Sequence, residues 1–379
     1  LVKRATTAIY NVIPIGQRNP EQNNGLTAVK NPADSTASPD GWHVLKGKPQ
    51  TDLKGNNVIA QSNPDNVMDI DQLVQLTRPQ NADLNFNFQF DPAQSPTDSA
   101  NRDAATVNMF YVANSMHDIL FNYGFDEAAG NFQDSNASGQ GQGNDPVIAN
   151  SQDGSGTNNA NFASGPDGMA GLMRMYVFTQ SSPSRDGALE NDIVSHEITH
   201  GLSTRLTGGA ANANCLTTTE SGGLGEGWSD TFGMLVSLSA TATRTTDFAS
   251  GFWAVNNPNG VRRFPYSTNM QTNPHTYGDL DQMQEVHQIG EVWATMLFEA
   301  MWNLVDAYGL TPPPQLAASA KSGTGNTVLM ALLIAGMKIQ PCNPTFVQAR
   351  DAILVADKTI QGGKDACLLW TAFAKRGLG

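Results

Sequence analysis

The sequence predicts an α+β fold in two lobes, a β-rich lobe over residues 1–187 and a helical lobe over residues 188–379. Two observations predict this division. Before residue 187 the chain is rich in Asn, Gln, Asp, Pro and Gly, with short apolar alternations such as 84–90, which is typical of short strands joined by turns. After that point apolar residues recur three and four positions apart, as they do on helices. A site between two such lobes would lie in a natural cleft.

Three segments of the first lobe differ from its general texture. Residues 104–123 carry apolar residues at helical spacing and predict a buried helix. Residues 135–159 are dense in Gly, Asn and Ser, so we expect a long surface loop there. The run 173–178, Met-Arg-Met-Tyr-Val-Phe, predicts a strand.

The second lobe is expected to be built from helices, and the first of them spans residues 188–206. The same spacing of apolar residues predicts further helices at 225–239, 284–308, 327–339, 345–356 and 364–375. The sequence shows no internal repeat.

Composition and charge exclude several classes of protein. The 379 residues include 39% apolar and 15% charged residues, whereas disordered chains combine low hydrophobicity with high charge density. A net charge of −13 argues against a nucleic-acid partner, because phosphates attract basic proteins. The longest apolar run, 328–337, is too short to span a bilayer. We therefore expect a folded, soluble, acidic protein without a nucleic-acid or membrane partner.

Other features indicate a secreted, processed chain. The sequence has no initiator Met and no signal-peptide pattern, and the pair Lys3-Arg4 suits cleavage by a secretory-pathway protease, although two surface charges would explain the pair as well. Asn136 begins an Asn-Ala-Ser glycosylation sequon, a common pattern that is weak by itself. Scarce Lys with abundant Thr, Asn, Gln and Ser also suits an extracellular protein.

The three cysteines fit the same environment. Cys342 and Cys367 lie about 25 positions apart, and a disulfide that closes a loop of this size stabilises a protein by about 3 kcal/mol. We expect these two to pair, which would leave Cys215 as a lone thiol.

The most specific motif is His196-Glu197-Ile198-Thr199-His200. On a helix, side chains at positions i and i+4 lie on one face, so both imidazoles can reach one metal ion. Glu197 would lie beside that ion and could take a proton from a metal-bound water. The alternative is a polar helix face without a metal, since such motifs also occur by chance.

A catalytic zinc usually has a third protein ligand and one open position. The three-histidine pattern is excluded, because Ser203 and Leu206 follow His200 where Gly and His would be required. Glu226, near the start of a predicted helix, is the candidate third ligand, although it could merely offset the helix dipole. Asp230 lies one turn beyond it, where it could accept a hydrogen bond from a ligand imidazole. Two histidines and one carboxylate favour zinc over copper or magnesium.

These motifs resemble the fungalysin family of secreted fungal metalloendopeptidases. The resemblance covers nearly the whole chain and is carried by the stretches 116–118, 124–125, 130–133, 196–209, 225–230, 341–346 and 376–379. It implies a two-lobed, thermolysin-like arrangement. It also implies an inhibitory propeptide, for which Lys3-Arg4 would be the processing junction.

The resemblance implies a role for each matching residue. His196, His200 and Glu226 would bind one Zn²⁺, and Glu197 would be the general base that later protonates the leaving amine. His287 matches a histidine that stabilises the tetrahedral oxyanion, where a hydrogen-bond donor acts on developing charge. A surface histidine at a helix start is the alternative for His287.

Substrate contacts are implied as well. Arg262 resembles an arginine that holds a substrate carbonyl near the specificity pocket, and Arg263 is the alternative match. Asn159 and Ala160 resemble the strand edge that pairs with the substrate backbone, since edge strands offer free N–H and C=O groups. A hydrophobic residue just after the scissile bond is expected from the apolar side chains placed by analogy near the pocket, Ile193 and Val261.

One departure from the thermolysin pattern concerns a tyrosine near the oxyanion. Residues 201–225 contain no Tyr, so another segment must fill that role or it is empty, and Tyr277 is a candidate. The sequence leaves bound Ca²⁺ open, because the acidic cluster of the thermolysin double-calcium site has no clear counterpart after Asp230. Among the other histidines, we expect His43 and His117 to be structural, whereas His275 lies in a loop that could line the cleft.

The sequence is therefore interpreted as a secreted zinc metalloendopeptidase that cleaves internal bonds of protein and peptide substrates, and nothing in it demands more than a monomer. A zinc aminopeptidase would use the same helix, but it needs acidic residues to capture the α-amine. An inactive secreted protein with a structural zinc or none is a rival of another class; Glu197 argues against it, because a structural site has no use for a general base. A carbohydrate-binding module has only the polar loops in its favour.

Overall fold

The computed structural model describes residues 7–22 and 25–379, so the expected processing pair Lys3-Arg4 lies outside the described residues. The strands are β1 (Ile9–Val12), β2 (Thr27–Lys30), β3 (Val44–Leu45), β4 (Lys48–Pro49), β5 (Val58–Ser62), β6 (Asn85–Phe86), β7 (Val147–Ser151), β8 (Ala160–Ala163), β9 (Leu172–Met175), β10 (Val177–Phe178) and β11 (Arg185–Asp186). The helices are α1 (Ile70–Leu73), α2 (Ser99–Asn122), α3 (Asn191–Leu206), α4 (Thr219–Ser237), α5 (Val286–Tyr308), α6 (Gly325–Ile339), α7 (Phe346–Ile360) and α8 (Ala366–Lys375). Short 3₁₀ turns are η1 (Glu127–Ala129), η2 (Gly187–Leu189), η3 (Tyr277–Gln282) and η4 (Pro313–Gln315).

The largest sheet has four strands in the order β5-β7-β9-β8. The first three run parallel, and β8 pairs antiparallel with β9 at the edge. Alternating side chains bury both faces of the sheet. Val58 and Ala60 belong to the main core, on the side where α2 packs, whereas Ile59 joins a small cluster with Leu73 of α1. A second sheet has the order β2-β1-β6, and β3–β4 and β10–β11 form two-stranded pairs.

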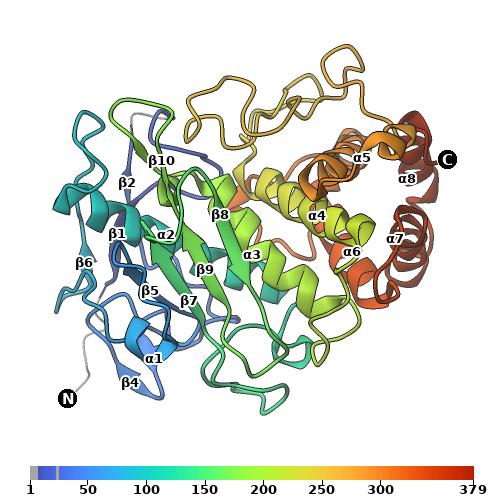
Figure 1. The fold of residues 1–379 in the computed structure, drawn as a ribbon. Helices are drawn as coiled ribbons and strands as arrows, with labels where there is room; N and C mark the ends of the chain where they lie inside the picture. The colour runs from blue at the N-terminus through green and yellow to red at the C-terminus, as the bar shows by residue number, and fades with distance from the viewer. Residues whose placement is uncertain (1–6, 23–24) are drawn as a thin grey trace.

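The helices that follow the sheets surround one central helix. Figure 1 shows the strands and α2 on one side, α4 to α8 on the other, and α3 between them. α3 contacts α2, β8 and α4, while α4 packs against α5, which in turn contacts α6 and α8. The main hydrophobic core is continuous from Tyr10 to Leu378 and passes through all of these helices.

The fold is therefore a mixed α+β fold, as predicted. Among the described residues every strand lies within 9–186, and α3 to α8 lie within 191–375. The division into lobes at 187 and 188 stays a prediction, because the core runs through both parts.

One prediction for the first part was wrong. Residues 135–159 are not one long loop, because they contain β7, an inner strand of the main sheet that is buried at every position. Its apolar run Val147-Ile148-Ala149 is short and flanked by polar residues, so the polar composition of the whole segment outweighed the signal of the strand. The alternation at 84–90 contains the short strand β6, of two residues, in agreement with the short strands predicted for this part.

Helix α4 begins before its predicted start at residue 225. Thr218 caps it, accepting from the backbone N–H of Ser221, and the glycines that suggested a turn lie inside the helix. They permit close packing on α5, because a β-carbon at Gly223 would lie 2.1 Å from Ile289 Cγ2 and one at Gly227 would lie 2.7 Å from the carbonyl oxygen of Gly290.

The predicted disulfide between Cys342 and Cys367 was also wrong. The structure joins Cys215 to Cys342 and leaves Cys367, exposed on α8, without a partner among the three cysteines, all of which are described. The folded chain brings the loop before α4 against the loop after α6, where the backbone N–H of Asn343 donates to the carbonyl of Cys215 at 2.8 Å. Short spacing along the chain did not reveal this distant contact.

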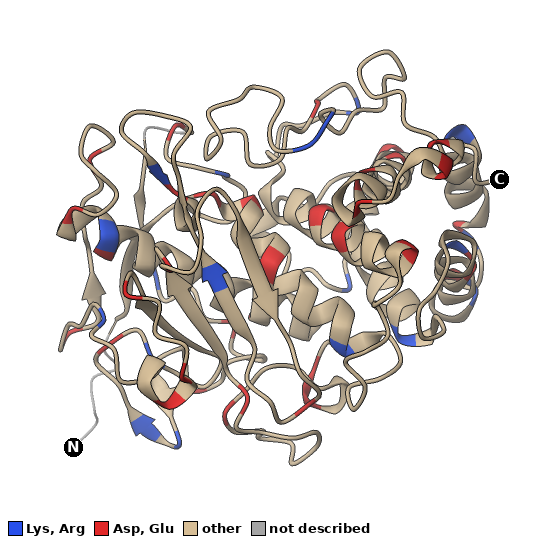
Figure 2. Cartoon of the chain, viewed as in Figure 1, with Lys and Arg blue, Asp and Glu red and all other residues tan. Residues whose placement is uncertain are grey.

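Charged residues are sparse on the fold. In Figure 2 most of the ribbon is tan, and the blue basic segments are scattered rather than gathered in one element. Of the helices in the described residues, none combines the length and the apolar character that crossing a membrane requires.

Candidate metal centre and cleft

Helix α3 carries the central motif and is buried along almost its whole length. His196 and His200 are one turn apart on it, and their Nε2 atoms lie 3.0 Å from each other. Gly201 admits the neighbouring aromatic layer, because a β-carbon there would lie 2.6 Å from the ring of Phe132. The sequence thus forms a helix that packs on every side yet turns two imidazoles toward one point.

Helix α4 brings the carboxylates to the same point. Glu226 Oε2 lies 3.2 Å from His196 Nε2, and Glu226 Oε1 lies 3.7 Å from His200 Nε2. One ligand atom from each of these three residues lies within 4.8 Å of the others, and the described residues hold no other such group of three. The geometry fits the expectation for Glu226.

Asp230 lies behind His196, one helical turn beyond Glu226. Its Oδ1 accepts from His196 Nδ1 at 2.7 Å, which turns His196 Nε2 toward His200 and Glu226. Arg262 donates to both carboxylate oxygens of Asp230, at 2.7 and 2.9 Å. The expected bond from Asp230 to an imidazole is present.

These residues fit a zinc ion. Two imidazole nitrogens in contact need a proton or a cation between them, and a nearby carboxylate supplies negative charge to hold it. Two histidines, one carboxylate and space on the cleft side match the donor set and the open position of catalytic zinc sites. Whether the chain also binds Ca²⁺ stays an expectation from the sequence.

The charges of the site depend on one another. Burial disfavours the charged forms, but the neighbouring histidines hold the pKa of Glu226 far below its usual range, and Arg262 with His196 does the same for the pKa of Asp230. Burial also opposes a charge on His196, yet its bonds to Asp230 and Glu226 raise its pKa to about 10. A proton on His196 and a metal cation are therefore alternative partners for the same two carboxylates.

Glu197 differs from these carboxylates, because its side chain has little compensation. It is 4% exposed, and its Oε2 has no hydrogen-bond partner within the described part of the chain. Burial raises the pKa of Glu197 to about 7, although the adjacent His196 charge opposes this shift. A carboxylate in this state is suited to take up and release a proton near neutral pH.

The site opens onto a cleft of about 680 Å³. Asn159 and Ala160 line it at the start of β8, the edge strand of the main sheet. His287, at the N-terminal end of α5, lies across the cleft with its Nε2 3.5 Å from Glu226 Oε2. Its Nδ1 is 2.5 Å from Glu285 Oε1, an interaction that directs Nε2 into the cleft.

Comparisons with known proteins agree with this arrangement. The profile of the fungalysin metallopeptidases (M36) matches residues 9–379. This chain belongs to the fungalysin family. Over 382 residues it is 50% identical to the extracellular metalloproteinase MEP of Neosartorya fischeri, covering 100% of this chain and 59% of that protein. It is also 48% identical over 373 residues to extracellular metalloproteinase 10 of Coccidioides posadasii, covering 98% of this chain and 58% of that one.

The fungalysin chain thus spans less than two thirds of the length of these curated relatives. Among solved structures, it is similar to the precursor of protealysin, a metalloproteinase from Serratia proteamaculans. The TM-score is 0.47 and the sequence identity 14%, over 78% of this chain and 86% of the other.

Of the other candidates from the sequence, one lies in the cleft and three do not line it among the described residues. Arg262 lines the cleft, whereas Arg263 lies over the ring of Phe264. Tyr277 packs against Phe346 and is not among the described residues that line the cleft. His275 is buried beside Glu291 instead of lining the cleft, because α5 covers its loop.

The two histidines expected to be structural make polar contacts within the protein. His43 Nε2 accepts from the hydroxyl of Tyr10 at 2.7 Å, and its ring stacks against aromatic neighbours. His117 Nδ1 lies 2.9 Å from Asp118 Oδ1, and Asn131 lies next to its other nitrogen.

Sequence reasoning missed two residues behind the fungalysin site. The hydroxyl of Tyr266 donates to Asp230 Oδ2, and burial together with the Asp230 charge raises the pKa of Tyr266 far above its usual range. Glu291 of α5 accepts from the backbone N–H groups of Arg263 and Phe264, at 3.0 and 2.7 Å. No spacing rule pointed to either residue, because each lies far along the chain from its partners: Tyr266 is 36 positions from Asp230, and Glu291 is 27 and 28 positions from the two N–H groups that it binds.

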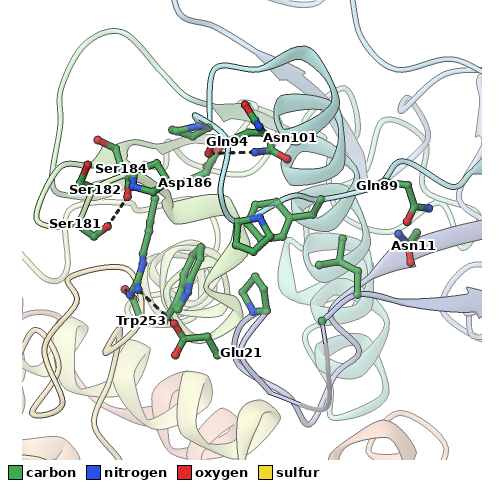
Figure 3. A pocket seen from close by; sticks show the side chains of 18 residues that line it. Asn11, Glu21, Gln89, Gln94, Asn101, Ser181, Ser182, Ser184, Asp186 and Trp253 are labelled. Atoms are coloured by element: carbon green, nitrogen blue, oxygen red, sulfur yellow. Dashed lines mark hydrogen bonds and ion pairs between the residues drawn. The ribbon is translucent and has the colours of Figure 1, made fainter.

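A second cavity, of about 560 Å³, shares no lining residue with the cleft. Figure 3 shows its labelled polar side chains, with Asn101 bonded toward Gln94 and Trp253 near Glu21. Two of its polar side chains are bonded to protein: Asn101 Nδ2 donates to the carbonyl of Asp91 at 2.9 Å, and Arg185 donates to the carbonyl of Trp253.

Proposed function

We propose that this chain is the catalytic part of a secreted zinc metalloendopeptidase. One observation carries the proposal, the convergence of His196, His200 and Glu226 on one point beside the buried, unpaired carboxylate of Glu197, as found within the described residues. The first three would hold Zn²⁺, and Asp230 would fix the orientation of His196. Membership of a metallopeptidase family supports the same assignment.

The chain's own residues supply the proton transfers of hydrolysis. A bound zinc ion contributes Lewis-acid chemistry, polarising the scissile carbonyl and making water more acidic. Glu197 Oε2 takes the proton that the attacking water loses and passes it to the leaving amine. His287 Nε2 faces the cleft, where it donates a hydrogen bond to the oxyanion that forms on the carbonyl oxygen. Because water is the nucleophile, no acyl-enzyme forms.

Substrate binding follows from the walls of the cleft. β8 has a free edge in the described sheet, so the backbone at Asn159 and Ala160 can pair with an extended peptide. Arg262 would hold a substrate carbonyl. The apolar side chains of Ile193 and Val261 line the cleft beside it, which supports a preference for a hydrophobic residue just after the scissile bond.

Location and partners are part of the proposal. The relatives are named extracellular metalloproteinases, which supports secretion of this chain. Its partners would be protein and peptide substrates and, before maturation, an inhibitory propeptide. We also propose a monomer, which light scattering of the purified protein tests.

Hydrolysis of an internally quenched, N-blocked peptide near neutral pH tests the activity. We expect cleavage that 1,10-phenanthroline stops and added Zn²⁺ restores. The blocked N-terminus separates the two peptidase classes, because an aminopeptidase needs a free α-amine. A zinc-loaded, folded protein that cleaves none of several such peptides would instead be an inactive binding protein.

Specificity has a separate test. Sequencing the fragments of a denatured protein digest should find mostly Leu, Ile, Val or Phe directly after the cleaved bonds. Predominantly acidic or basic residues at that position would contradict the role given to Ile193 and Val261.

A further inference from the structure

We propose that Tyr266 is a positioning residue for His196, acting through Asp230, and that Glu291 holds the loop that carries Tyr266. The proposal rests on the proposed function in taking His196 as a metal ligand. Nothing in the family match or in the relatives' names assigns a role to either residue.

The carboxylate of Asp230 is held at both of its oxygens. It is 3% exposed and receives four hydrogen bonds, one from His196, two from Arg262 and one from Tyr266. A carboxylate has about four lone-pair sites, so these donors use all of them and fix its plane. The direction of the bond to His196 Nδ1 therefore depends on the donors to the other oxygen.

Tyr266 and Arg262 differ in their position relative to the cleft. Arg262 lines the cleft and is shared with the substrate side, since its Nη2 also lies 4.0 Å from Glu226 Oε2. Tyr266 is fully buried and is absent from the described residues that line the cleft. Its hydroxyl can therefore hold Asp230 in one orientation whatever occupies the cleft.

The loop that carries Tyr266 is held by contacts to Phe248 and Glu291. The backbone of Tyr266 pairs with Phe248 through two hydrogen bonds of 2.8 and 2.9 Å. Glu291, 2% exposed, accepts from the N–H groups of residues 263 and 264 with one carboxylate oxygen each. The loop that presents both Arg262 and Tyr266 to Asp230 is thus held at two points, by the backbone of Phe248 and by the side chain of Glu291.

The test compares Tyr266→Phe with Tyr10→Phe. Both remove a hydroxyl from a fully buried tyrosine that donates one side-chain hydrogen bond, but Tyr10 donates to His43 in the remote core. The zinc dissociation constant is measured by competition with a chromogenic chelator, and kcat and KM with the blocked peptide. Loss of an outer partner of a ligand weakens metal binding about 10- to 100-fold, and we expect about 3- to 10-fold for Tyr266→Phe, one bond further out.

We expect Tyr10→Phe to bind zinc as the wild type does, and Tyr266→Phe to lower kcat with little change in KM. Equal zinc affinity in the two variants would overturn the proposal. If Tyr266→Phe does not fold, Glu291→Gln and Glu127→Gln decide, because both change a buried glutamate that accepts from two successive backbone N–H groups, but Glu127 holds residues 137 and 138, outside the loop that carries Tyr266. Weaker zinc binding confined to Glu291→Gln supports the proposal, and equal affinities overturn it.

The same measurements distinguish a failure of the proposed endopeptidase function from a failure of the positioning role of Tyr266. A wild type that binds zinc but cleaves no blocked peptide refutes the endopeptidase function, while the zinc affinities of the variants still decide the role of Tyr266. A wild type that cleaves the peptide, with zinc affinity unaffected in Tyr266→Phe, refutes only the positioning role.

Discussion

At the scale of single residues, the role proposed for Glu197 rests on how little surrounds its carboxylate. The metal-ligand candidates form ion pairs with one another, whereas Glu197 forms none among the described residues and its Oε2 is buried without a hydrogen-bond partner there. A group placed in this way is destabilised as a carboxylate until a proton or a hydrogen bond arrives. Such a site favours proton transfer over metal binding.

We therefore expect Glu197→Gln to abolish hydrolysis and keep zinc. The amide has the same shape but cannot act as a base, so kcat should fall at least about 100-fold, within the usual range for general-base removal. Metal analysis should still find one zinc per chain, and thermal unfolding should not occur at a lower temperature, because a buried charge has been removed. Glu21→Gln, on the surface, is the control. Activity retained by Glu197→Gln would refute the base role.

His43 is a second residue whose burial has a measurable consequence. Its Nε2 accepts from Tyr10, and its Nδ1 donates to the carbonyl of Asp52 at 2.8 Å, so both nitrogens are used by the neutral ring. Burial lowers the pKa of His43 to about 4, although the Asp52 carbonyl opposes this. In the unfolded chain a histidine pKa lies near 6.5.

Between pH 6.5 and pH 4 the unfolded chain therefore binds a proton at His43 that the folded chain does not. The free energy of unfolding should fall as the pH is lowered through this window, by about 3 kcal/mol from this residue. Urea unfolding of the wild type and of His43→Gln at several pH values measures this. The variant, which does not titrate there, should lose less stability over the window. Equal slopes for both proteins would contradict the shift.

At the scale of elements, the contact between α4 and α5 shows why glycines lie inside a helix. Gly223 and Gly227 face α5 so closely that a β-carbon would overlap Ile289 or the backbone of Gly290. Gly225 lies on the same helix, but its β-carbon would meet nothing nearer than Leu216 Cδ1 at 3.6 Å. The helix gives up local propensity so that Glu226 can come close to α3 and α5.

Gly223→Ala and Gly225→Ala form a matched pair for this contact. We expect Gly223→Ala to lower the free energy of unfolding by about 1–3 kcal/mol, because overpacking forces α4 and α5 apart. Gly225→Ala should leave it unchanged or raise it by up to about 1 kcal/mol, through helix propensity. Denaturant titrations of both variants measure the difference, and equal effects would show that the helices can separate freely.

Element prediction from the sequence was good where the pattern is long and local. All six helices expected after residue 187 are present, with ends that differ by a few residues. β7 was missed because five buried residues among turn-forming neighbours give a weak signal. The start of α4 was missed because glycine usually marks a turn, and only the packing on α5 explains its place in a helix.

At the scale of the whole molecule, the candidate site also combines residues predicted from local patterns with residues that only folding brings together. The helical spacing within α3 and within α4 predicted which side chains share a face, and the structure brings these faces together. Tyr266 and Glu291 come from separate elements that meet only when the chain folds. Their contribution depends on tertiary contacts, which one sequence does not display.

The disulfide is the clearest case of such a long-range contact. Cys215 and Cys342 are 127 positions apart, and the loop that they close contains α4, α5 and α6. Next to the bridge, Asn343 Oδ1 accepts from the N–H of Thr217 at 2.8 Å and the hydroxyl of Ser221 at 3.0 Å, so the bridge lies at the cap of α4. Closing a long loop restricts the unfolded chain most.

We expect Cys215→Ala with Cys342→Ala to lower the free energy of unfolding by about 2–5 kcal/mol. Cys367→Ala should change it by less than about 0.5 kcal/mol, because that side chain is exposed and unpaired in the described structure. Urea unfolding without reductant measures both, and adding reductant should bring the wild type and Cys367→Ala down to the double variant. If Cys367→Ala is the destabilised protein, Cys342 pairs with Cys367 after all, and non-reducing peptide mapping would then recover that linked pair instead of the one joining residues 215 and 342.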